Sequence, residues 1–414
     1  MPTRNVIVAQ SGGPTPVINS SLQGVLDACR DWPETFGRVY GGWHGIEGVL
    51  REELLDLTAQ DPRELELLAV TPGAGAIGTC RYRLRGADGP DYARVLEVVR
   101  AHDVGWFFYI GGNDSMDTAD KISRLARARG VDLTVAGVPK TIDNDVGDTA
   151  GTLIDHTPGY GSVARYWTCL FQNANEENAG FRPAGPVLVL QVMGRATGFI
   201  PATARLADPG REMPLVIVMP EAGLTLPRAA DAVREMVARR GRCLVALSEG
   251  FDVGDIGARH DAFGHVEFGA SDRTAAQGLV AHLNDTGLPA RGLASGQVSG
   301  TDQRCNAVYA STVDREEAWR AGRQAVEIAR RHGGGWMATL LREPGPGYAV
   351  RYDRVPLARV ANSVRTFPAD WLAPGGLDVT DAFLRYARPL IGDAWAKVPL
   401  EDGRQRFARL RPLF

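Results

Sequence analysis

Short apolar runs of strand length alternate with helix-period segments along most of the chain. This alternation is typical of parallel β-sheets flanked by helices and predicts an α/β fold. Because the chain has 414 residues and a single hydrophobic core rarely grows past about 250–300 residues, two α/β lobes are expected. The expected strands are 6–10, 39–40, 67–70, 106–110, 134–138, 187–192, 215–219, 243–247, 292–294 and 336–341. The expected helices are 17–29, 91–101, 116–129, 227–239, 273–283 and 316–331.

The composition excludes several classes of function. A formal net charge of −3 and the lack of a Lys/Arg block argue against nucleic-acid binding. The sequence has neither a signal-peptide core nor an apolar run near the ~18–20 residues of a membrane span, so a cytoplasmic protein without a membrane partner is expected. The cysteines are odd in number and form no CxxC pair, which favours structural thiols: Cys29, Cys80, Cys169, Cys243 and Cys305.

The segment Pro139–Asp145 places two acids, a cation and a hydroxyl in a turn directly after an apolar run. Pro139 lacks the backbone donor needed to continue the strand ladder. The turn is therefore expected at a carboxyl end of the sheet, which is the edge where open α/β sheets bind ligands. Asp143 and Asp145 are two residues apart and would project from the same side of an extended backbone. This pattern indicates a base held against a phosphate.

Two glycine-containing loops follow other predicted strands. Ser11–Pro16 precedes a helix, so its backbone amides can face a phosphate at the helix N-terminus. Gly111–Ser115 also opens a helix, and the side chains of Asn113 and Asp114 offer oxygens suited to Mg²⁺ or its waters. An ordinary βα turn and an ordinary helix cap are the alternative interpretations of these loops.

Charged residues follow two further strands. Arg195 comes after the strand at 187–192, where its guanidinium can bind two phosphate oxygens. Glu249 ends the strand at 243–247, where a carboxylate can accept hydrogen bonds from sugar hydroxyls. Either charge can instead be an ordinary solvated one.

The segment Gly73–Gly78 matches the GxGxxG dinucleotide fingerprint and raises an NAD-dependent oxidoreductase as a distant alternative. That fingerprint requires a helix directly after it, and a basic loop at 79–86 follows instead. Arg81 in this loop is interpreted as a cation directed at an anionic substrate, the alternative being a solvated loop.

Taken in order, these motifs resemble those of the phosphofructokinase family. The resemblance extends from residue 5 to about residue 310, and 155–162 resembles the pyrophosphate-using branch. It implies two three-layer α/β lobes with mainly parallel sheets and an active site in the cleft between them. The implied reaction is Mg²⁺-dependent transfer of a phosphoryl group to the 1-hydroxyl of fructose 6-phosphate, by a homodimer or homotetramer. The motifs are Ser11-Gly12-Gly13, Gly78–Arg81, Gly111–Ser115, Pro139–Asp145, Met193-Gly194-Arg195 and Ser248-Glu249.

The resemblance also implies a division of the chain. Residues 1–150 with roughly 300–365 would form the phosphoryl-donor lobe, and 151–300 the sugar-phosphate lobe. Residues 366–414 would form a C-terminal extension to which no role is assigned.

Residue roles follow from the same resemblance. Asp143 would be the base, with Lys140 and Arg195 as the other catalytic residues. The implied donor-binding residues are Gly12, Gly13, Arg81, Gly112, Asp114, Ser115 and Lys140. The implied substrate-binding residues are Thr141, Asp143, Asp145, Met193, Gly194, Arg195, Glu249 and Arg291. The implied metal ligands are Asp114 and Asn113.

The expected phosphoryl donor is pyrophosphate. ATP-using members of the family have glycine at the positions of Asp114 and Lys140. The Asp114 carboxylate would occupy the space of the α-phosphate of ATP and repel its charge, by an upper-end estimate of about 4 kcal/mol at a ~4 Å separation and an effective dielectric constant of ~20. Lys140 would supply a compact cation to pyrophosphate.

The chain departs from the family pattern at several anion-binding positions. Asn113 replaces an aspartate, and Gln297 and Gly300 replace a histidine and an arginine. An arginine usually contributed by a neighbouring subunit has no counterpart in register, and Arg182 and Arg304 are its candidate replacements. The open alternatives are sedoheptulose 7-phosphate as acceptor, ATP as donor, and a sugar-phosphate sensor of this fold without turnover.

Overall fold

The computed structural model describes residues 3–86, 89–261, 264–361 and 363–412, which divide into two compact units. Unit 1 comprises Met1–Ser162, Arg304–Arg365 and Asp393–Phe414, and unit 2 comprises Val163–Gln303 and Thr366–Gly392. The predicted single extension at 366–414 is therefore shared between the units, while residues 1–2, 87–88, 262–263, 362 and 413–414 of the predicted ranges lie outside the described residues.

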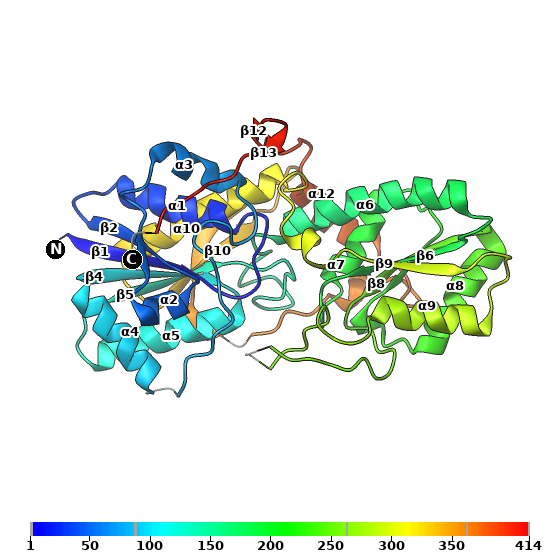
Figure 1. Cartoon of the computed structure of the whole chain (residues 1–414), viewed down its shortest axis with the longest axis horizontal. Helices are drawn as coiled ribbons and strands as arrows, with labels where there is room; N and C mark the ends of the chain where they lie inside the picture. The colour runs from blue at the N-terminus through cyan, green and yellow to red at the C-terminus, as the bar shows by residue number, and fades with distance from the viewer. Residues whose placement is uncertain (1–2, 87–88, 262–263, 362, 413–414) are drawn as a thin grey trace. The chain divides into compact units, whose positions relative to one another are not determined.

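Unit 1 is built on a seven-stranded sheet in the order β11-β10-β5-β4-β1-β2-β3 (Figure 1). The inner strands pair in parallel, and the two edge strands pair in antiparallel fashion with their neighbours. All eight residues of β4 are buried, as expected for a strand covered by helices on both faces. The strands are β1 Arg4–Gln10, β2 Phe36–Gly42, β3 Leu54–Asp56, β4 Val104–Gly111, β5 Thr134–Pro139, β10 Trp336–Arg342 and β11 Val350–Pro356.

Helices α1 and α10 cover one face of this sheet and α4 and α5 the other (Figure 1). The larger helices are α1 Ile18–Arg30, α4 Pro90–Ala101, α5 Asn113–Ala128 and α10 Thr312–His332. The shorter ones are α2 Ile46–Arg51, α3 Pro62–Glu66, α11 Leu357–Val360 and the 3₁₀ turn η1 Leu67–Val70. A small hairpin of β12 Leu400–Glu401 and β13 Arg404–Gln405 belongs to the last segment of unit 1.

Two glycines allow α1 and α10 to pack with their backbones close together. A Cβ atom on Gly24 of α1 would lie 2.0 Å from the carbonyl oxygen of Trp319, and one on Gly322 of α10 would lie 2.2 Å from that of Ser21. Real Cβ atoms do not approach a carbonyl oxygen this closely, so both positions require glycine. The contact matters for function because α10 also carries buried acids that support the candidate site.

Unit 2 has a four-stranded parallel sheet in the order β7-β8-β6-β9. In Figure 1, α6 covers one face of this sheet, and α8 and α9 cover the other. The strands are β6 Val187–Val192, β7 Leu215–Val218, β8 Cys243–Ser248 and β9 Ala294–Val298. The helices are α6 Tyr160–Phe181, which lies almost entirely in this unit, α7 Phe199–Ala202, α8 Leu226–Arg240, α9 Ala275–Thr286 and α12 Asp381–Ile391. The 3₁₀ turns are η2 Thr203–Ala207, η3 Pro220–Ala222 and η5 Ala369–Trp371, while η4 Gly300–Arg304 crosses the unit boundary.

The C-terminal segment 366–392 contributes an aromatic cluster to unit 2. Phe367 packs edge-on against Phe199 with ring centroids 5.3 Å apart, and Trp371 packs against Tyr386 at 4.7 Å. These rings supply apolar burial and favourable aromatic geometry. The segment is thus part of the unit 2 core rather than an appendage.

The predicted secondary structure needs several corrections, among them the edge strands β3 and β11, which were not predicted. The run Leu67–Val70 forms the 3₁₀ turn η1 rather than a strand, because a short apolar run fits a buried helical turn as well as a strand. Helix α6 was not predicted, and its buried side chains include the aromatic Tyr166, Trp167 and Phe171. Helix α12 was not predicted either, and it contains Pro389 in its last turn.

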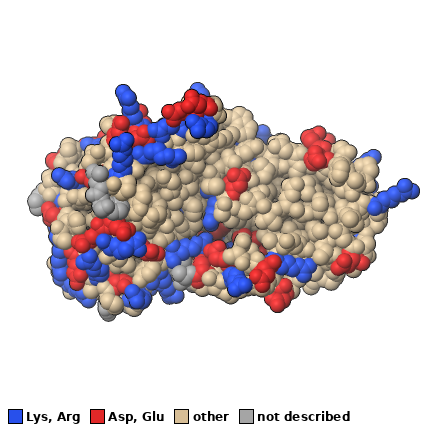
Figure 2. Space-filling view, viewed as in Figure 1, with Lys and Arg blue, Asp and Glu red and all other residues tan. Residues whose placement is uncertain are grey.

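None of the described helices combines the length and the apolar character that crossing a lipid bilayer requires. On the face of the described chain that Figure 2 shows, basic side chains lie among acidic ones rather than in one continuous stripe.

Replacing Gly322 by alanine should lower the free energy of unfolding by about 1–3 kcal/mol, because the added methyl group overpacks the α1–α10 contact. Gly180→Ala is the matched control, since Gly180 is also helical and an added Cβ there meets nothing within 4 Å. That control should raise stability by up to about 1 kcal/mol through helix propensity. Urea unfolding of both variants measures the difference, and equal stability of the two would contradict the packing account.

Candidate functional site

The loops after β1 and β4 lie at a topological switch point of the unit 1 sheet. Strand β1 leads through α1 to β2 on one side, and β4 leads through α5 to β5 on the other. At such a point the two loops leave a crevice outside the carboxyl ends of the strands, where ligands bind. The loops are held together, because the amide of Ser11 donates to the carbonyl of Ile110 at 2.9 Å. The first predicted loop, Ser11–Pro16, therefore lies at this switch point.

Three cationic side chains surround the Gly12-Gly13 turn. The Nζ of Lys140 donates to the carbonyl oxygen of Gly13 at 2.6 Å. A Cβ atom on Gly13 would lie 2.9 Å from Nη1 of Arg304 and 3.4 Å from Nη2 of Arg81. The absence of a side chain on Gly13 thus leaves room for both guanidinium groups beside the turn.

Lys140 is only 4% exposed, and its surroundings perturb its charge. Burial is the largest cause that lowers the pKa of its ammonium group to about 8; the charges of Arg81 and Arg304 act in the same direction, and those of Asp143 and Asp145 oppose it. A buried ammonium beside two guanidinium groups favours a multiply charged anion as its partner. This geometry joins predicted donor residues from three separate loops.

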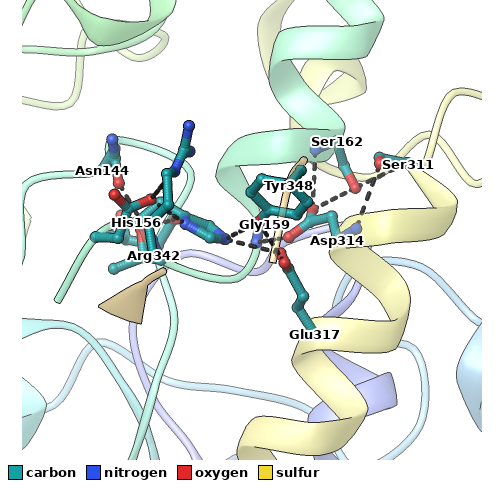
Figure 3. Close-up of polar contacts among 12 residues, drawn as sticks. Asn144, His156, Gly159, Ser162, Ser311, Asp314, Glu317, Arg342 and Tyr348 are labelled. Carbon is teal, nitrogen blue, oxygen red and sulfur yellow. Dashed lines mark hydrogen bonds and ion pairs between the residues drawn. The ribbon is translucent and has the colours of Figure 1, made fainter. Parts of the chain in front are cut away.

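The turn that carries Asp143 is fixed by its own backbone and by residue 157. The amide of Asp143 donates to Oγ1 of Thr141 at 3.1 Å. Asn144 adopts a left-handed conformation with φ of 57° and is fully buried. Its Oδ1 accepts a hydrogen bond from the amide of Thr157 at 3.1 Å, and Asn144 is labelled in Figure 3. On the far side of the turn, the amide of Arg365 donates to the carbonyl of Asp145 at 2.8 Å.

In unit 2, the two predicted sugar-binding loops lie next to each other. Strands β6 and β8 are paired so that Val192 faces Ser248, which brings the residues after both strands to one edge. The Ser248 hydroxyl donates to the carbonyl of Gly194 at 3.3 Å. A Cβ atom on Gly250 would lie only 1.9 Å from the carbonyl of Arg195, so this contact requires glycine. Arg195 and Glu249 are thereby held on adjacent turns.

Comparison with known proteins identifies the family. The phosphofructokinase family model matches residues 5–329. The chain belongs to the phosphofructokinase family. It is 36% identical to a pyrophosphate–fructose 6-phosphate 1-phosphotransferase of Halomonas elongata, across 99% of this chain and 97% of the relative. It is 37% identical to the protein of the same name from Methylococcus capsulatus, across 94% and 92% of the two chains. A crystal structure of a pyrophosphate-dependent phosphofructokinase from Nitrosospira multiformis matches with a TM-score of 0.86 and 35% identity, covering 99% of this chain and 97% of that one.

These findings confirm the family and the α/β fold class predicted from the sequence. The relatives named here all bear the names of pyrophosphate-dependent members of the family, the branch that Asp114 and Lys140 indicate. The dinucleotide interpretation of Gly73–Gly78 is not supported. The segment forms a turn, and no helix follows it directly.

The predicted Mg²⁺ ligands lie at the start of α5. Asp114 is exposed in the first turn, and the Asn113 amide donates to the carbonyl oxygen of Ser363. The described residues contain no cluster of three or more His, Cys, Asp or Glu suited to a metal ion. Mg²⁺ typically uses one or two carboxylates, substrate phosphates and water, so Asp114 fits a site completed by the donor, and the Asn113 contact with Ser363 uses the side-chain NH₂ rather than the oxygen that a metal would require.

Gly112 and Ser115, two other predicted donor-binding residues, have different surroundings. Gly112 precedes α5 with its Cα near the carbonyl of Lys140, since a Cβ there would lie 3.7 Å from that oxygen. Ser115 is buried and its side chain packs against Gly111, where an added Cβ would lie 2.1 Å from the serine Oγ. Gly112 thus lets the loop lie close to Lys140, and the Ser115 side chain packs against the Gly111 end of the loop.

Arg291 is not brought to the edge that carries Met193–Arg195. It is exposed and precedes β9, whose first residue, Ala294, pairs in parallel with Val187 at the start of β6. Arg291 therefore lies at the amino end of the unit 2 sheet, and Arg195 follows the carboxyl end. Of the two candidate replacement arginines, Arg304 joins the Lys140 group, whereas Arg182 lies just after α6.

The sequence analysis gave no role to the residues that support the Asp143 turn from α10. Asp314 accepts hydrogen bonds from the amides of Gly159 and Ser162 at 2.8 and 2.9 Å (Figure 3). Ser311 caps α10 by accepting from the amide of Asp314. The capping pattern of serine with an acid three positions later was the available signal, and it places the helix start at residue 312 rather than 316.

Proposed function

We propose that this protein transfers a phosphoryl group from pyrophosphate to the 1-hydroxyl of fructose 6-phosphate, yielding fructose 1,6-bisphosphate and orthophosphate. The observation that carries the proposal is the buried Lys140 ammonium, which contacts the Gly13 carbonyl beside Arg81 and Arg304 at the sheet switch point. The site suits a small, highly charged anion. The names of the relatives at 36–37% identity support the same reaction.

Phosphoryl transfer depends mainly on positioning and on neutralising charge. In the proposed mechanism, Asp143 accepts the proton of the sugar 1-hydroxyl as that oxygen bonds to phosphorus. The bond from this phosphorus to the bridging oxygen breaks, and orthophosphate leaves with the electron pair. Lys140, Arg81 and Arg304 offset the negative charge on the donor and on the leaving phosphate. Because the leaving group is orthophosphate, the reaction is readily reversible.

Magnesium is part of this proposal. Asp114 would hold the ion together with the donor, and Asn113 would orient the loop through its contact with Ser363. When bound, Mg²⁺ supplies further neutralisation of phosphate charge. The roles of Gly12, Gly13 and Gly112 are to let backbone and cations approach the donor closely.

The acceptor would be bound by unit 2. Arg195 and Glu249, held on adjacent turns, would contact the phosphate and hydroxyl groups of the sugar, and Met193 and Gly194 would line the same edge. Thr141 and Asp145 would line the acceptor side of the Asp143 turn. Because Arg291 lies at the opposite end of its own sheet, its proposed contact with the sugar 6-phosphate requires a second copy of the chain. A homo-oligomer is therefore part of the proposal. A cytoplasmic location is proposed as well.

The donor is distinguished from ATP by charge at the start of α5. A helix N-terminus ordinarily attracts phosphate, and the Asp114 carboxylate in the first turn offsets that attraction. Lys140 compensates on the other side of the loop, where its backbone amide donates to the carbonyl of Gly111 at 3.1 Å. The pair thus favours a compact donor that is bound close to Lys140.

A donor-by-acceptor activity matrix tests the proposal. Pyrophosphate and ATP are each paired with fructose 6-phosphate and sedoheptulose 7-phosphate, and release of orthophosphate or ADP is measured. Pyrophosphate with fructose 6-phosphate should give the highest kcat/KM. Preference for ATP, or for the seven-carbon sugar, would replace the proposed substrate, and sugar-phosphate binding without any turnover would indicate a sensor.

The same matrix, run on the double variant Asp114→Gly with Lys140→Gly, tests the donor assignment. Removing the repulsive carboxylate and the compensating cation should raise activity with ATP and lower it with pyrophosphate. Asp117→Gly is the control, because Asp117 lies on the same helix and pairs with Lys121. An unchanged donor preference in the double variant would contradict the electrostatic account.

Replacing Asp143 by asparagine should lower kcat by about 100- to 10,000-fold, the typical contribution of a general base. The KM values should change much less, since the side-chain volume is kept. Stopped assays at saturating substrates measure the loss, and circular dichroism verifies the fold. Near-normal kcat would remove Asp143 from the role of base.

A further inference from the structure

A fully buried histidine, His156, immediately precedes the residue that contacts the 141–144 turn, which is called the catalytic turn below because it carries Asp143. His156 is not among the donor and acceptor contacts described above. His156 in unit 1 places Nδ1 2.8 Å from Oδ2 of Asp155 and Nε2 2.7 Å from Oε2 of Glu317. Figure 3 shows the imidazole of His156 and the carboxylate of Glu317 pointing toward each other. Each ring nitrogen therefore faces its own carboxylate.

This geometry assigns a positive charge to the ring. A neutral imidazole has one N–H donor, whereas an imidazolium has two. Only the charged form donates to both carboxylates at once. Burial acts to lower the pKa of His156, but the charge of Glu317 and the hydrogen bonds to Asp155 and Glu317 outweigh it and raise the pKa to about 9.

Other groups complete the network and fix both carboxylates. The Tyr348 hydroxyl donates to Oε1 of Glu317 and lies 3.5 Å from Nε2 of His156 (Figure 3). Arg342 donates to Oδ2 of Asp155 at 3.1 Å, and Arg365 donates to the Asp155 carbonyl. The charged and titratable groups facing His156 are thus Asp155, Glu317, Tyr348, Arg342 and Arg365.

The residue that follows His156 holds the catalytic turn at two points. The Thr157 amide donates to Oδ1 of Asn144 at 3.1 Å, and its hydroxyl donates to the carbonyl of Thr141 at 2.9 Å. These two contacts bracket Asp143 in the sequence. Any displacement of His156 is therefore transmitted through one peptide unit to both sides of the proposed base.

We propose that the imidazolium of His156, held between Asp155 and Glu317, is a positioning residue that keeps the 141–144 turn in the conformation needed for phosphoryl transfer. The inference rests on the proposed function, because it assigns His156 to the support of Asp143. It does not involve contact between His156 and either substrate. The expected consequence is a dependence of kcat, rather than of KM, on the charge of this buried ring.

The direction of the pH dependence follows from the raised pKa. The stabilisation from the charged ring is fully present below the ordinary histidine value of about 6.5 and is lost as the pH rises through about 9. At saturating donor and acceptor, kcat should fall over that alkaline range. Loss of the Lys140 proton near pH 8 also lowers kcat, because Lys140 neutralises the leaving phosphate, so the effect of His156 is isolated by comparing variants rather than by the wild-type profile alone.

Glu317→Gln tests the proposal, because it removes the charge that does most to raise the pKa of His156 while nearly preserving shape. The variant should lower kcat by up to about 100-fold, as expected for a displaced catalytic group, and its alkaline limb should move to lower pH. Glu316→Gln is the matched control, since Glu316 is the preceding residue of α10 and forms a surface pair with Arg320. Superimposable kcat profiles of the two variants would overturn the proposal.

A second measurement keeps the test decisive if Glu317→Gln does not fold. In the wild-type protein labelled with ¹³C at histidine Cε1, the His156 resonance should remain that of a charged ring at neutral pH and titrate near 9, with assignment by His156→Gln. A resonance that titrates near 6.5 would overturn the proposal. This readout needs no turnover, so failure of the proposed reaction and failure of the His156 assignment are distinguishable.

Discussion

The burial of the Lys140 ammonium beside Gly13 is the interaction on which the rest of the site depends. Removing a charged amine from water costs free energy unless other groups compensate for the lost hydration. The lowered pKa of Lys140, about 8, reflects that cost. The Gly13 carbonyl compensates in part, and the nearby carboxylates of Asp143 and Asp145 do so at longer range. Because Arg81 and Arg304 add to the positive charge, an anion bound at the glycine turn would reduce the electrostatic repulsion among the three cations.

The fold brings these groups together through strand order rather than through sequence proximity. Gly13, Arg81 and Lys140 come from three loops, and Arg304 begins a later segment of the same unit. Parallel strands end at one edge of the sheet, and the switch point between β1 and β4 is the position at which open α/β sheets bind ligands. Asp314 of α10 accepts from the amide of Gly159, two residues after the Thr157 that contacts the Asp143 turn, and glycines let α10 pack closely against α1.

Much of this could be predicted from the sequence, and the failures have physical reasons. The strands that carry the site, 6–10, 106–110 and 134–138, were predictable because a parallel strand covered on both faces is continuously apolar. The run at 67–70 was not, because four apolar residues fit a buried 3₁₀ turn equally well. The clustering of Arg304 with Lys140 also depends on tertiary structure. Although Arg304 was one of two candidate replacements, only the coordinates show which of them adjoins the glycine turn.

The position of Arg291 shows what a sequence motif can predict and what it cannot. The motif position of Arg291 predicted a contact with the sugar phosphate, but the parallel pairing of β9 with β6 puts it at the wrong end of its own sheet for that role within one chain. The composition of the Asn113 loop suggested a metal ligand, and this stays a prediction, because the contact with Ser363 uses the side-chain NH₂ and not the oxygen that would bind a metal. For Arg291, residue type suggested the chemistry, and the pairing of the strands decided at which end of the sheet that chemistry is available.

The central claim is that Lys140 is the principal attachment point for a small diphosphate. Calorimetric titration of pyrophosphate into the wild-type protein and into Lys140→Met, with Mg²⁺ present and at two salt concentrations, tests it most directly. We expect binding to the wild type that weakens at higher salt and as the pH rises through about 8, and binding to the variant that is at least tenfold weaker, which corresponds to about 1.4 kcal/mol. Equal affinity of the two proteins for pyrophosphate would contradict the account.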